Sequence, residues 1–169
     1  NFNLGEKEKN NAIITGPNAG GKSTFIKSVV ISILLSQTLG ICPGKRLSLT
    51  LFSKLETYLN IPDLKGKESL FEAEVNRALS YIKALTEIPE DNYSLIVMDE
   101  IFNSTNPEEG ISGAYSICQR LSKFRNSLSI ITTHFNYLTN LEKDTSDFKN
   151  YKIPIIRRNN KINYPYKIT

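Results

Sequence analysis

Apolar residues follow two kinds of pattern along the chain, and the first is a set of short continuous runs. These runs cover residues 12–15, 94–98 and 128–133. Apolar runs of this length, with turn-forming or polar residues directly after them, are typical of strands that are buried on both faces of a parallel sheet. Three strands of such a sheet are therefore expected.

The second pattern is the recurrence of apolar residues at helical spacing between those runs. It predicts helices over residues 22–35, 69–87 and 108–124. Pro107 lies at the start of the third helix, where a missing backbone N–H is tolerated, and acidic residues follow in the first turn. Strands that alternate with helices indicate the α/β fold class, with a mainly parallel sheet flanked by helices.

Weaker patterns predict three further strands. Leu47, Leu49 and Leu51 alternate with polar residues, which is typical of a half-buried strand. Near the end of the chain, residues 151–157 and 161–168 are two short strand-like runs on either side of a turn.

Length and composition limit the classes of protein that remain. A chain of 169 residues fits one domain over residues 1–169, and 40% hydrophobic with 22% charged residues excludes disordered and fibrous proteins. The longest strongly apolar stretch, residues 29–35, is far shorter than the ~20 residues that span a bilayer, so no membrane partner is expected. The chain begins at Asn1 without an initiator Met or a signal peptide, which we interpret as a fragment of a larger protein.

Charge and cysteine content change this picture little. The net charge of +4 comes from 21 basic and 17 acidic residues without a dense basic cluster, so an ordinary solvated surface is favoured over a nucleic-acid interface. Cys42 and Cys118 are far apart in sequence and have no neighbouring His, which argues against a metal site. Two buried thiols in a reducing compartment are the default interpretation, and this predicts an intracellular protein.

The segment between the first strand and the first helix fits GxxxxGK(S/T), the phosphate-binding loop called Walker A. Glycines let successive backbone N–H groups turn inward on an anion, and the following helix presents its positive N-terminal end. Lys22 is expected to neutralise the β- and γ-phosphates of ATP, and the Ser23 hydroxyl to bind Mg²⁺. The alternative is a glycine-rich turn with an incidental lysine, although a chance match is on the order of one per cent. The candidate phosphate-binding residues are Gly16, Pro17, Asn18, Ala19, Gly20, Gly21, Lys22, Ser23 and Thr24.

Two acidic residues, Asp99 and Glu100, end the apolar run of residues 94–98. Because open α/β sheets bind ligands at the carboxyl ends of their strands, these acids are expected beside the phosphate loop, as the Walker B pair. Asp99 would bind Mg²⁺ directly or through water, and Glu100 would orient or deprotonate the water that attacks ATP. Without the phosphate loop, solvated turn residues would be the favoured interpretation.

His134 and Ser69 are two further candidates. His134, the only histidine, follows the run of residues 128–133. From the order of the motifs we expect its imidazole to reach the γ-phosphate or the attacking water, although a lone His after an apolar strand is more often structural. Ser69 caps the start of the second predicted helix and Glu72 lies three residues later, the spacing of a capping box, so local sequence alone favours a structural role for Ser69.

Together these motifs resemble the ATPase domain of the MutS family of DNA mismatch repair proteins, a branch of the ABC-type ATPases. The resemblance covers nearly the whole chain. Residues 14–24 are similar to the TGPNxGGKST loop of the family, and Ser69, Phe71 and Glu74 resemble its STFxxE signature, with Asp63 in the preceding loop. Further matches are the DEI of residues 99–101, Thr105, Gly110, the ATHY-like residues 132–135 and the YKL-like residues 166–168.

The resemblance implies partners and ligands that spacing alone does not show. In such ATPases two domains face each other head to tail, and the signature serine of one completes the γ-phosphate site of the other. A homodimer or heterodimer of this domain is thus implied, with Ser69 as the contact between subunits, Asn18 beside the phosphates and Thr105 in the interface loop. The resemblance also implies ATP and Mg²⁺ as ligands, double-stranded DNA bound through domains outside this chain, and a DNA-associated location in the cytoplasm, nucleoid or nucleus.

One loop departs from the family pattern. Where the family commonly has DEIGRGTS, this chain has Phe102 and Ser104 in place of the two glycines. The departure motivates a second hypothesis, an ATP-binding dimerisation module with little hydrolysis in DNA recombination or repair. A third hypothesis, another ABC-type ATPase of chromosome maintenance, is disfavoured because the chain lacks an LSGGQ-type signature. The favoured hypothesis is Mg²⁺-dependent ATP hydrolysis that drives conformational switching of a MutS-like protein.

Overall fold

The computed structural model describes residues 2–5, 8–59, 70–158 and 161–169 of the chain. Strands and helices alternate from the first strand to the fifth, as the apolar pattern predicted, and two short strands follow. In chain order the elements are β1 (Asn11–Thr15), the 3₁₀ turn η1 (Asn18–Gly20), α1 (Lys22–Leu39), β2 (Phe52–Tyr58), α2 (Leu70–Thr86), β3 (Tyr93–Met98), α3 (Pro107–Leu121), β4 (Ser127–Thr132), the 3₁₀ turn η2 (Asn136–Asn140), α4 (Leu141–Asp144), β5 (Phe148–Lys152), β6 (Ile156–Arg158) and β7 (Lys161–Asn163).

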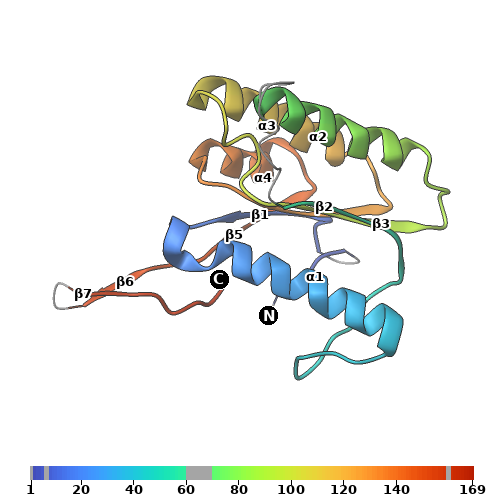
Figure 1. The fold of residues 1–169 in the computed structure, drawn as a ribbon, viewed down its shortest axis with the longest axis horizontal. Coiled ribbons are helices and arrows are strands. Elements are labelled where there is room, and N and C mark those ends of the chain that lie inside the picture. The colour runs from blue at the N-terminus through green and yellow to red at the C-terminus, as the bar shows by residue number, and fades with distance from the viewer. Residues whose placement is uncertain (1, 6–7, 60–69, 159–160) are drawn as a thin grey trace.

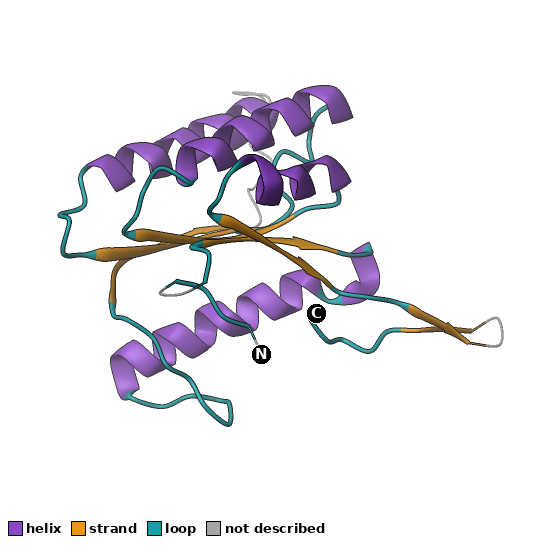
Figure 2. Cartoon of the chain, turned by 180° about the vertical axis from the view of Figure 1, so that it is seen from behind, coloured by secondary structure: helices purple, strands orange, loops and turns teal. Residues whose placement is uncertain are grey.

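The strands β1 to β5 form one sheet in the order β2-β3-β4-β1-β5. Every neighbouring pair in this sheet is parallel. Helix α1 covers one face, and helices α2, α3 and α4 cover the other (Figure 1). Figure 2 shows the same three layers from behind. The α/β class and the parallel sheet flanked by helices are thereby confirmed.

The central strands are buried on both faces because their consecutive apolar side chains alternate between two cores. In β1, Ile13 packs in the core beneath α2 and α3, whereas Ala12 and Ile14 pack in the core beneath α1. In β3, Ile96 belongs to the first core and Val97 to the second. A continuous apolar run thus satisfies both layers of helices, as the sequence pattern indicated.

Two predicted helices can be compared at their first turns. The α3 helix begins at Pro107, and the side chain of Asn106 caps it by accepting a hydrogen bond of 3.0 Å from the backbone N–H of Glu109. This agrees with the predicted start. The α2 helix is described from Leu70 onward, and Ser69 lies outside the described residues, so the predicted cap of α2 stays a prediction.

The strand predicted from Leu47, Leu49 and Leu51 is wrong. These residues lie before β2 and outside any strand, and the Leu51 side chain is 70% exposed. β2 itself lies at the edge of the sheet and pairs only with β3. Edge strands often carry charged residues. In β2 these are Lys54 and Glu56, whose Nζ and Oε1 atoms lie 3.5 Å apart. Their charges interrupt the apolar pattern of β2, so the sequence did not indicate a strand there.

The chain from β5 onward differs from the two strands predicted over residues 151–157 and 161–168. β5 ends at Lys152, shortly before Pro154, which has no N–H to continue the ladder. β6 and β7 pair antiparallel as a hairpin that projects from the body of the domain (Figure 1). The last residue returns to the sheet, since Thr169 and Lys152 exchange two backbone hydrogen bonds of 2.8 and 2.9 Å.

Two further expectations concern the membrane and the cysteines. Within the described ranges, no helix combines the length and the apolar character needed to cross a bilayer.

Cys118 is fully buried in α3, whereas Cys42 is only partly buried, and both thiols are free. The expectation of buried thiols is confirmed for Cys118 and wrong for Cys42.

Candidate functional site

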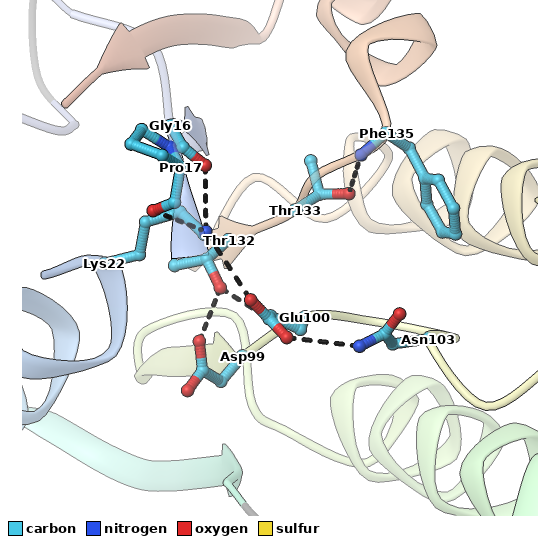
Figure 3. A network of polar contacts seen from close by, with 9 residues as sticks. All are labelled: Gly16, Pro17, Lys22, Asp99, Glu100, Asn103, Thr132, Thr133 and Phe135. Carbon is cyan, nitrogen blue, oxygen red and sulfur yellow. Dashed lines mark hydrogen bonds and ion pairs between the residues drawn. The ribbon is translucent and has the colours of Figure 1, made fainter. Parts of the chain in front are cut away.

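The ends of three neighbouring strands carry the polar residues of the candidate site. β4 lies between β3 and β1, and the three strands are parallel. Their carboxyl ends therefore meet at one edge of the sheet, which is where open α/β sheets bind ligands. The glycine-rich loop, residues 16–23, follows β1, the acidic pair follows β3, and Thr132 ends β4 (Figure 3).

The glycine-rich loop adopts backbone conformations that favour glycine. Gly16 has a φ of 152° and Gly21 a φ of 92°, which residues with a Cβ atom rarely adopt. A Cβ atom at Gly16 would also lie 2.8 Å from the backbone oxygen of Ile153. Because Gly21 directly precedes α1, its left-handed conformation turns the loop into the helix and leaves the first N–H groups of α1 available to an anion in the loop.

Lys22 lies inside the glycine-rich loop with only 1% of its surface exposed. Its Nζ donates hydrogen bonds to the backbone oxygens of Gly16 at 2.9 Å and Pro17 at 3.3 Å. The same Nζ lies 3.5 Å from Oε1 of Glu100 (Figure 3). A buried ammonium requires such partners because an unpaired buried charge is very costly. The loop thus holds a full positive charge beside the acidic pair.

Thr132 contacts both acidic residues from the end of β4. Its hydroxyl donates to Oδ1 of Asp99 at 2.6 Å and accepts from the backbone N–H of Glu100 at 2.9 Å. The side-chain amide of Asn103 donates to Oε2 of Glu100 at 3.2 Å. The Asp99 carboxylate is therefore oriented by a hydrogen bond from β4, and the Glu100 carboxylate by one from the turn that follows it (Figure 3).

Two of these contacts were not expected from the sequence. Thr132 was noted only as part of a family motif, although a polar residue at the end of a buried strand was a usable signal. Asn103 carried no such signal because its contact depends on the turn after β3. Glu100 itself has a φ of 51°, a left-handed conformation that is uncommon for Glu and that is often found at functional sites.

His134 is exposed and lies beside the glycine-rich loop. Its ring centroid is 4.2 Å from that of Phe135, whose backbone N–H donates to the hydroxyl of Thr133 at 2.9 Å. The imidazole lines an open pocket of about 430 Å³. The structure therefore brings His134 to the loop, and its contact with the γ-phosphate or the attacking water stays a prediction. The pocket is lined by Thr15, Gly16, Pro17, Asn18, His134, Asn136, Lys152, Ile153, Pro154 and Ile155.

The remaining candidates differ in what the structure shows of them. Ser23 is half-buried in the first turn of α1, next to Lys22. Ser69 and Asp63 lie outside the described residues, so the contact of Ser69 with a second subunit stays a prediction. Gly20 is buried, and the exposed members of the loop region are Asn18, Ala19 and Thr24.

A metal ion at this site would be bound partly by protein side chains and partly by oxygens of a bound anion. Among the residues that the structure describes, no three His, Cys, Asp or Glu side chains gather closely enough to hold a metal by themselves. Mg²⁺ commonly binds one or two protein oxygens together with phosphates and waters, and Asp99 with Ser23 fits that pattern. The Thr132 hydroxyl uses only Oδ1 of Asp99, so it does not occupy the second carboxylate oxygen.

The fold and the site together define an α/β domain in which a glycine-rich loop, a buried lysine and an acidic pair meet at one edge of a parallel sheet. Residues 12–169, nearly the whole chain, match the family described as MutS domain V. The chain belongs to this family, so the resemblance to MutS proteins is confirmed.

Individual relatives agree with the family match. The DNA mismatch repair protein MutS of Finegoldia magna is 32% identical over 168 residues, which are 98% of this chain and 19% of the relative. The protein of the same name from Thermotoga maritima is 32% identical over 164 residues, which are 96% of this chain and 20% of the relative. That of Clostridioides difficile is 32% identical over 155 residues. The chain spans about a fifth of the length of the curated relatives it matches.

Proposed function

We propose that the chain is the ATPase domain of a MutS-like DNA mismatch repair protein, with a P-loop of the ABC-type ATPases, and that it binds and hydrolyses ATP with Mg²⁺. The observation that carries the proposal is the position of Lys22, a buried ammonium inside a glycine-rich loop and 3.5 Å from a carboxylate oxygen of Glu100. A buried cation, a glycine-rich loop and a helix N-terminus suit a ligand with several negative charges, such as a triphosphate. Hydrolysis would drive conformational switching of the larger protein.

Lys22 changes partners when ATP binds. Its present partners include the backbone oxygens of Gly16 and Pro17, which carry only partial charges. Oxygens of the β- and γ-phosphates are fully charged and therefore form stronger hydrogen bonds with the ammonium. Ser23 and Asp99 would hold Mg²⁺, which supplies further positive charge to the phosphates when it is bound.

Glu100 is the residue that acts on the attacking water. Its backbone is fixed by Thr132 and its carboxylate by Lys22 and Asn103, so the side chain has a defined direction at the sheet edge. From there the carboxylate orients or deprotonates water. His134 lines the pocket beside the loop and contacts the γ-phosphate or the same water.

A second copy of the domain completes this site in the proposal. The exposure of Asn18 and Ala19 leaves the loop open to another subunit, and Ser69 is the residue that the family resemblance assigns to the contact. The dimer is a homodimer or a heterodimer, and double-stranded DNA binds through parts of the larger protein outside this chain. The protein is accordingly placed at DNA inside the cell.

A second candidate function is an ATP-dependent dimerisation module that hardly hydrolyses ATP. The observation in its favour is the turn after the acidic pair, where Phe102 and Ser104 replace glycines of the family pattern and contact α2. A stiffer turn is compatible with ATP binding but would oppose the small movements that turnover requires. Membership of the MutS family leaves the third hypothesis, a chromosome-maintenance ATPase, without support.

Binding and turnover are measured separately to test the proposal. A fluorescent ATP analogue reports affinity with and without Mg²⁺, and phosphate release reports hydrolysis. Lys22→Ala should lower affinity about tenfold or more, because charge-assisted hydrogen bonds to phosphate are lost. Lys27→Ala removes an exposed lysine of the same helix and should change neither quantity. Mg-ATP-dependent dimerisation without phosphate release would favour the second candidate, and absence of nucleotide binding would refute both.

A further inference from the structure

Phe102 is a bulky residue in a backbone conformation that favours glycine. Its φ is 56°, and its side chain is 1% exposed. Left-handed backbone is disfavoured for residues with a Cβ atom and persists only where the surroundings impose it. The contacts of the Phe102 ring must therefore offset a local cost that glycine would not have.

The Phe102 ring is wedged between the two long helices that cover this face of the sheet. On one side it packs edge-to-face with Phe71 in the first turn of α2, with ring centroids 5.7 Å apart. On the other side it lies against the backbone of α3, since a Cβ atom added to Gly113 would be 2.9 Å from the ring. The α3 helix also passes close to the turn at Gly110, where an added Cβ would be 2.7 Å from the Phe102 carbonyl oxygen.

Ser104 makes a second contact between the same turn and α2. Its hydroxyl donates to Oε2 of Glu74 at 2.5 Å, and Glu74 is 6% exposed. This hydrogen bond gives a buried carboxylate a partner on the turn, and breaking it would be costly, so it favours one position of the turn. Both contacts come from the two positions at which the family pattern has glycine. They are therefore properties of this chain rather than of the pattern.

The turn that these contacts hold is the one that carries Glu100. At its start, Thr132 fixes the backbone of Glu100 through the hydrogen bond from the Glu100 N–H. At its end, Phe102 fixes it to α2 and α3, and Ser104 fixes it to α2. Asn103, between these two anchors, donates to the Glu100 carboxylate at 3.2 Å. Loss of the second anchor would leave Glu100 on a turn that is free to move, with only Lys22 and Asn103 to hold its carboxylate.

We propose that Phe102, assisted by Ser104, is a positioning residue for Glu100: its ring wedge between α2 and α3 sets the turn that directs the Glu100 carboxylate toward Lys22. The inference rests on the proposed function insofar as that carboxylate acts on the attacking water. Phe102 does not touch the nucleotide and acts through the turn alone. If the ring has no positioning role, the opposite result is expected. Phe102→Gly then removes the cost of a left-handed residue with a Cβ atom, and the turn should become more stable.

The first measurement needs no nucleotide. Hydrogen exchange of the Glu100 amide, followed by NMR in the ligand-free chain, reports the hydrogen bond to Thr132. In Phe102→Gly this amide should exchange roughly tenfold faster or more, because the turn opens locally. Phe148→Leu is the matched control, since it removes a fully buried ring from the same core and should leave Glu100 exchange close to that of the wild type. Unchanged or slower exchange in Phe102→Gly overturns the proposal, as does equal acceleration in the control.

The second measurement separates turnover from binding. Phe102→Gly should lower kcat about tenfold with KM for ATP changed less than about twofold, because misplacement of a catalytic group affects the transition state and not substrate binding. Phe102→Leu keeps apolar bulk in the wedge and should restore kcat to within about threefold of the wild type. A wild-type kcat in Phe102→Gly, or a kcat loss shared by Phe148→Leu, overturns the proposal.

Two outcomes distinguish the inference from the proposed function. If the wild-type chain does not hydrolyse ATP, the exchange measurement still decides whether Phe102 sets the turn. If Phe102→Gly does not fold, Phe102→Ala and Ser104→Gly replace it, and each should accelerate exchange of the Glu100 amide by about twofold or more. Wild-type exchange in both of these variants would overturn the proposal.

Discussion

Replacement of Glu100 by Gln tests the ion pair at the centre of the candidate site. The change preserves the size of the side chain and removes the negative charge 3.5 Å from Nζ of Lys22. With an effective dielectric constant of about 20, Coulomb's law gives about 5 kcal/mol for two unit charges at this distance. The Glu100 side chain is 28% exposed, so solvent screening reduces that value, and we expect the free energy of unfolding to fall by about 1 to 3 kcal/mol.

Thermal unfolding of the nucleotide-free protein measures this loss. In a domain of this size, 1 kcal/mol changes Tm by about 2 to 4 °C, so Glu100→Gln should lower Tm by about 2 to 12 °C. Glu90→Gln removes the same charge from an exposed position and should change Tm by no more than about 2 °C. Equal melting temperatures for Glu100→Gln and the wild type would show that the pair does not stabilise the free site.

The same variant also separates ATP binding from turnover. Lys22 loses a competing partner when the Glu100 charge is removed, so affinity for a fluorescent ATP analogue should be retained or increased. Phosphate release should fall by about two orders of magnitude or more, because the attacking water loses its base. Steady-state hydrolysis at the wild-type rate would refute the assignment of Glu100, whatever the effect on Tm.

Three further predictions concern the loop, the thiols and a surface tyrosine. Gly16→Ala should lower the free energy of unfolding by about 2 to 4 kcal/mol, measured by urea denaturation, because it combines an unfavourable φ with a contact too close to a backbone oxygen. Burial raises the pKa of the Cys118 thiol, so maleimide labelling of the native protein followed by mass spectrometry should modify Cys42 and leave Cys118 unmodified until the chain unfolds; equal labelling would contradict its burial. The hydrogen bond to Asp144 raises the pKa of Tyr115 to about 12, so its contribution to stability is complete below pH 10 and is lost as the pH rises through 12. Ultraviolet titration of the wild type against Tyr115→Phe should show this ionisation, and Asp144→Asn should return it toward pH 10.

The part of the site that was predictable from the sequence depends on local chemistry. A glycine-rich loop needs its special backbone conformations within a few residues, so residues 16–23 were recognisable from the spacing of glycines and Lys22 alone. The buried strands were recognisable for a similar reason, because each must present apolar residues to two layers of helices. These local requirements sufficed to place the glycine-rich loop and the acidic pair at the same edge of the sheet.

The part that was missed depends on contacts between distant segments. β2 is a strand because β3 provides a partner for its backbone, and its own polar sequence contains little sign of this. Asn103 reaches Glu100 only because the turn after β3 has left-handed residues at both Glu100 and Phe102. The sequence showed that Phe102 replaces a family glycine, but only the packed helices α2 and α3 show what its ring contacts.

The central position of β4 explains why one hydroxyl connects the two acidic residues to the rest of the site. β4 lies between the strands that carry the acidic pair and the glycine-rich loop, so a residue at its end is beside both. A threonine hydroxyl can donate one hydrogen bond and accept another, which satisfies the Asp99 carboxylate and the Glu100 N–H together. A phosphate that replaces the present partners of Lys22 would alter the charge facing Glu100. Because the Glu100 backbone is tied to Thr132 on one side and through Phe102 to two helices on the other, we infer that such a change reaches the helical layer through this turn.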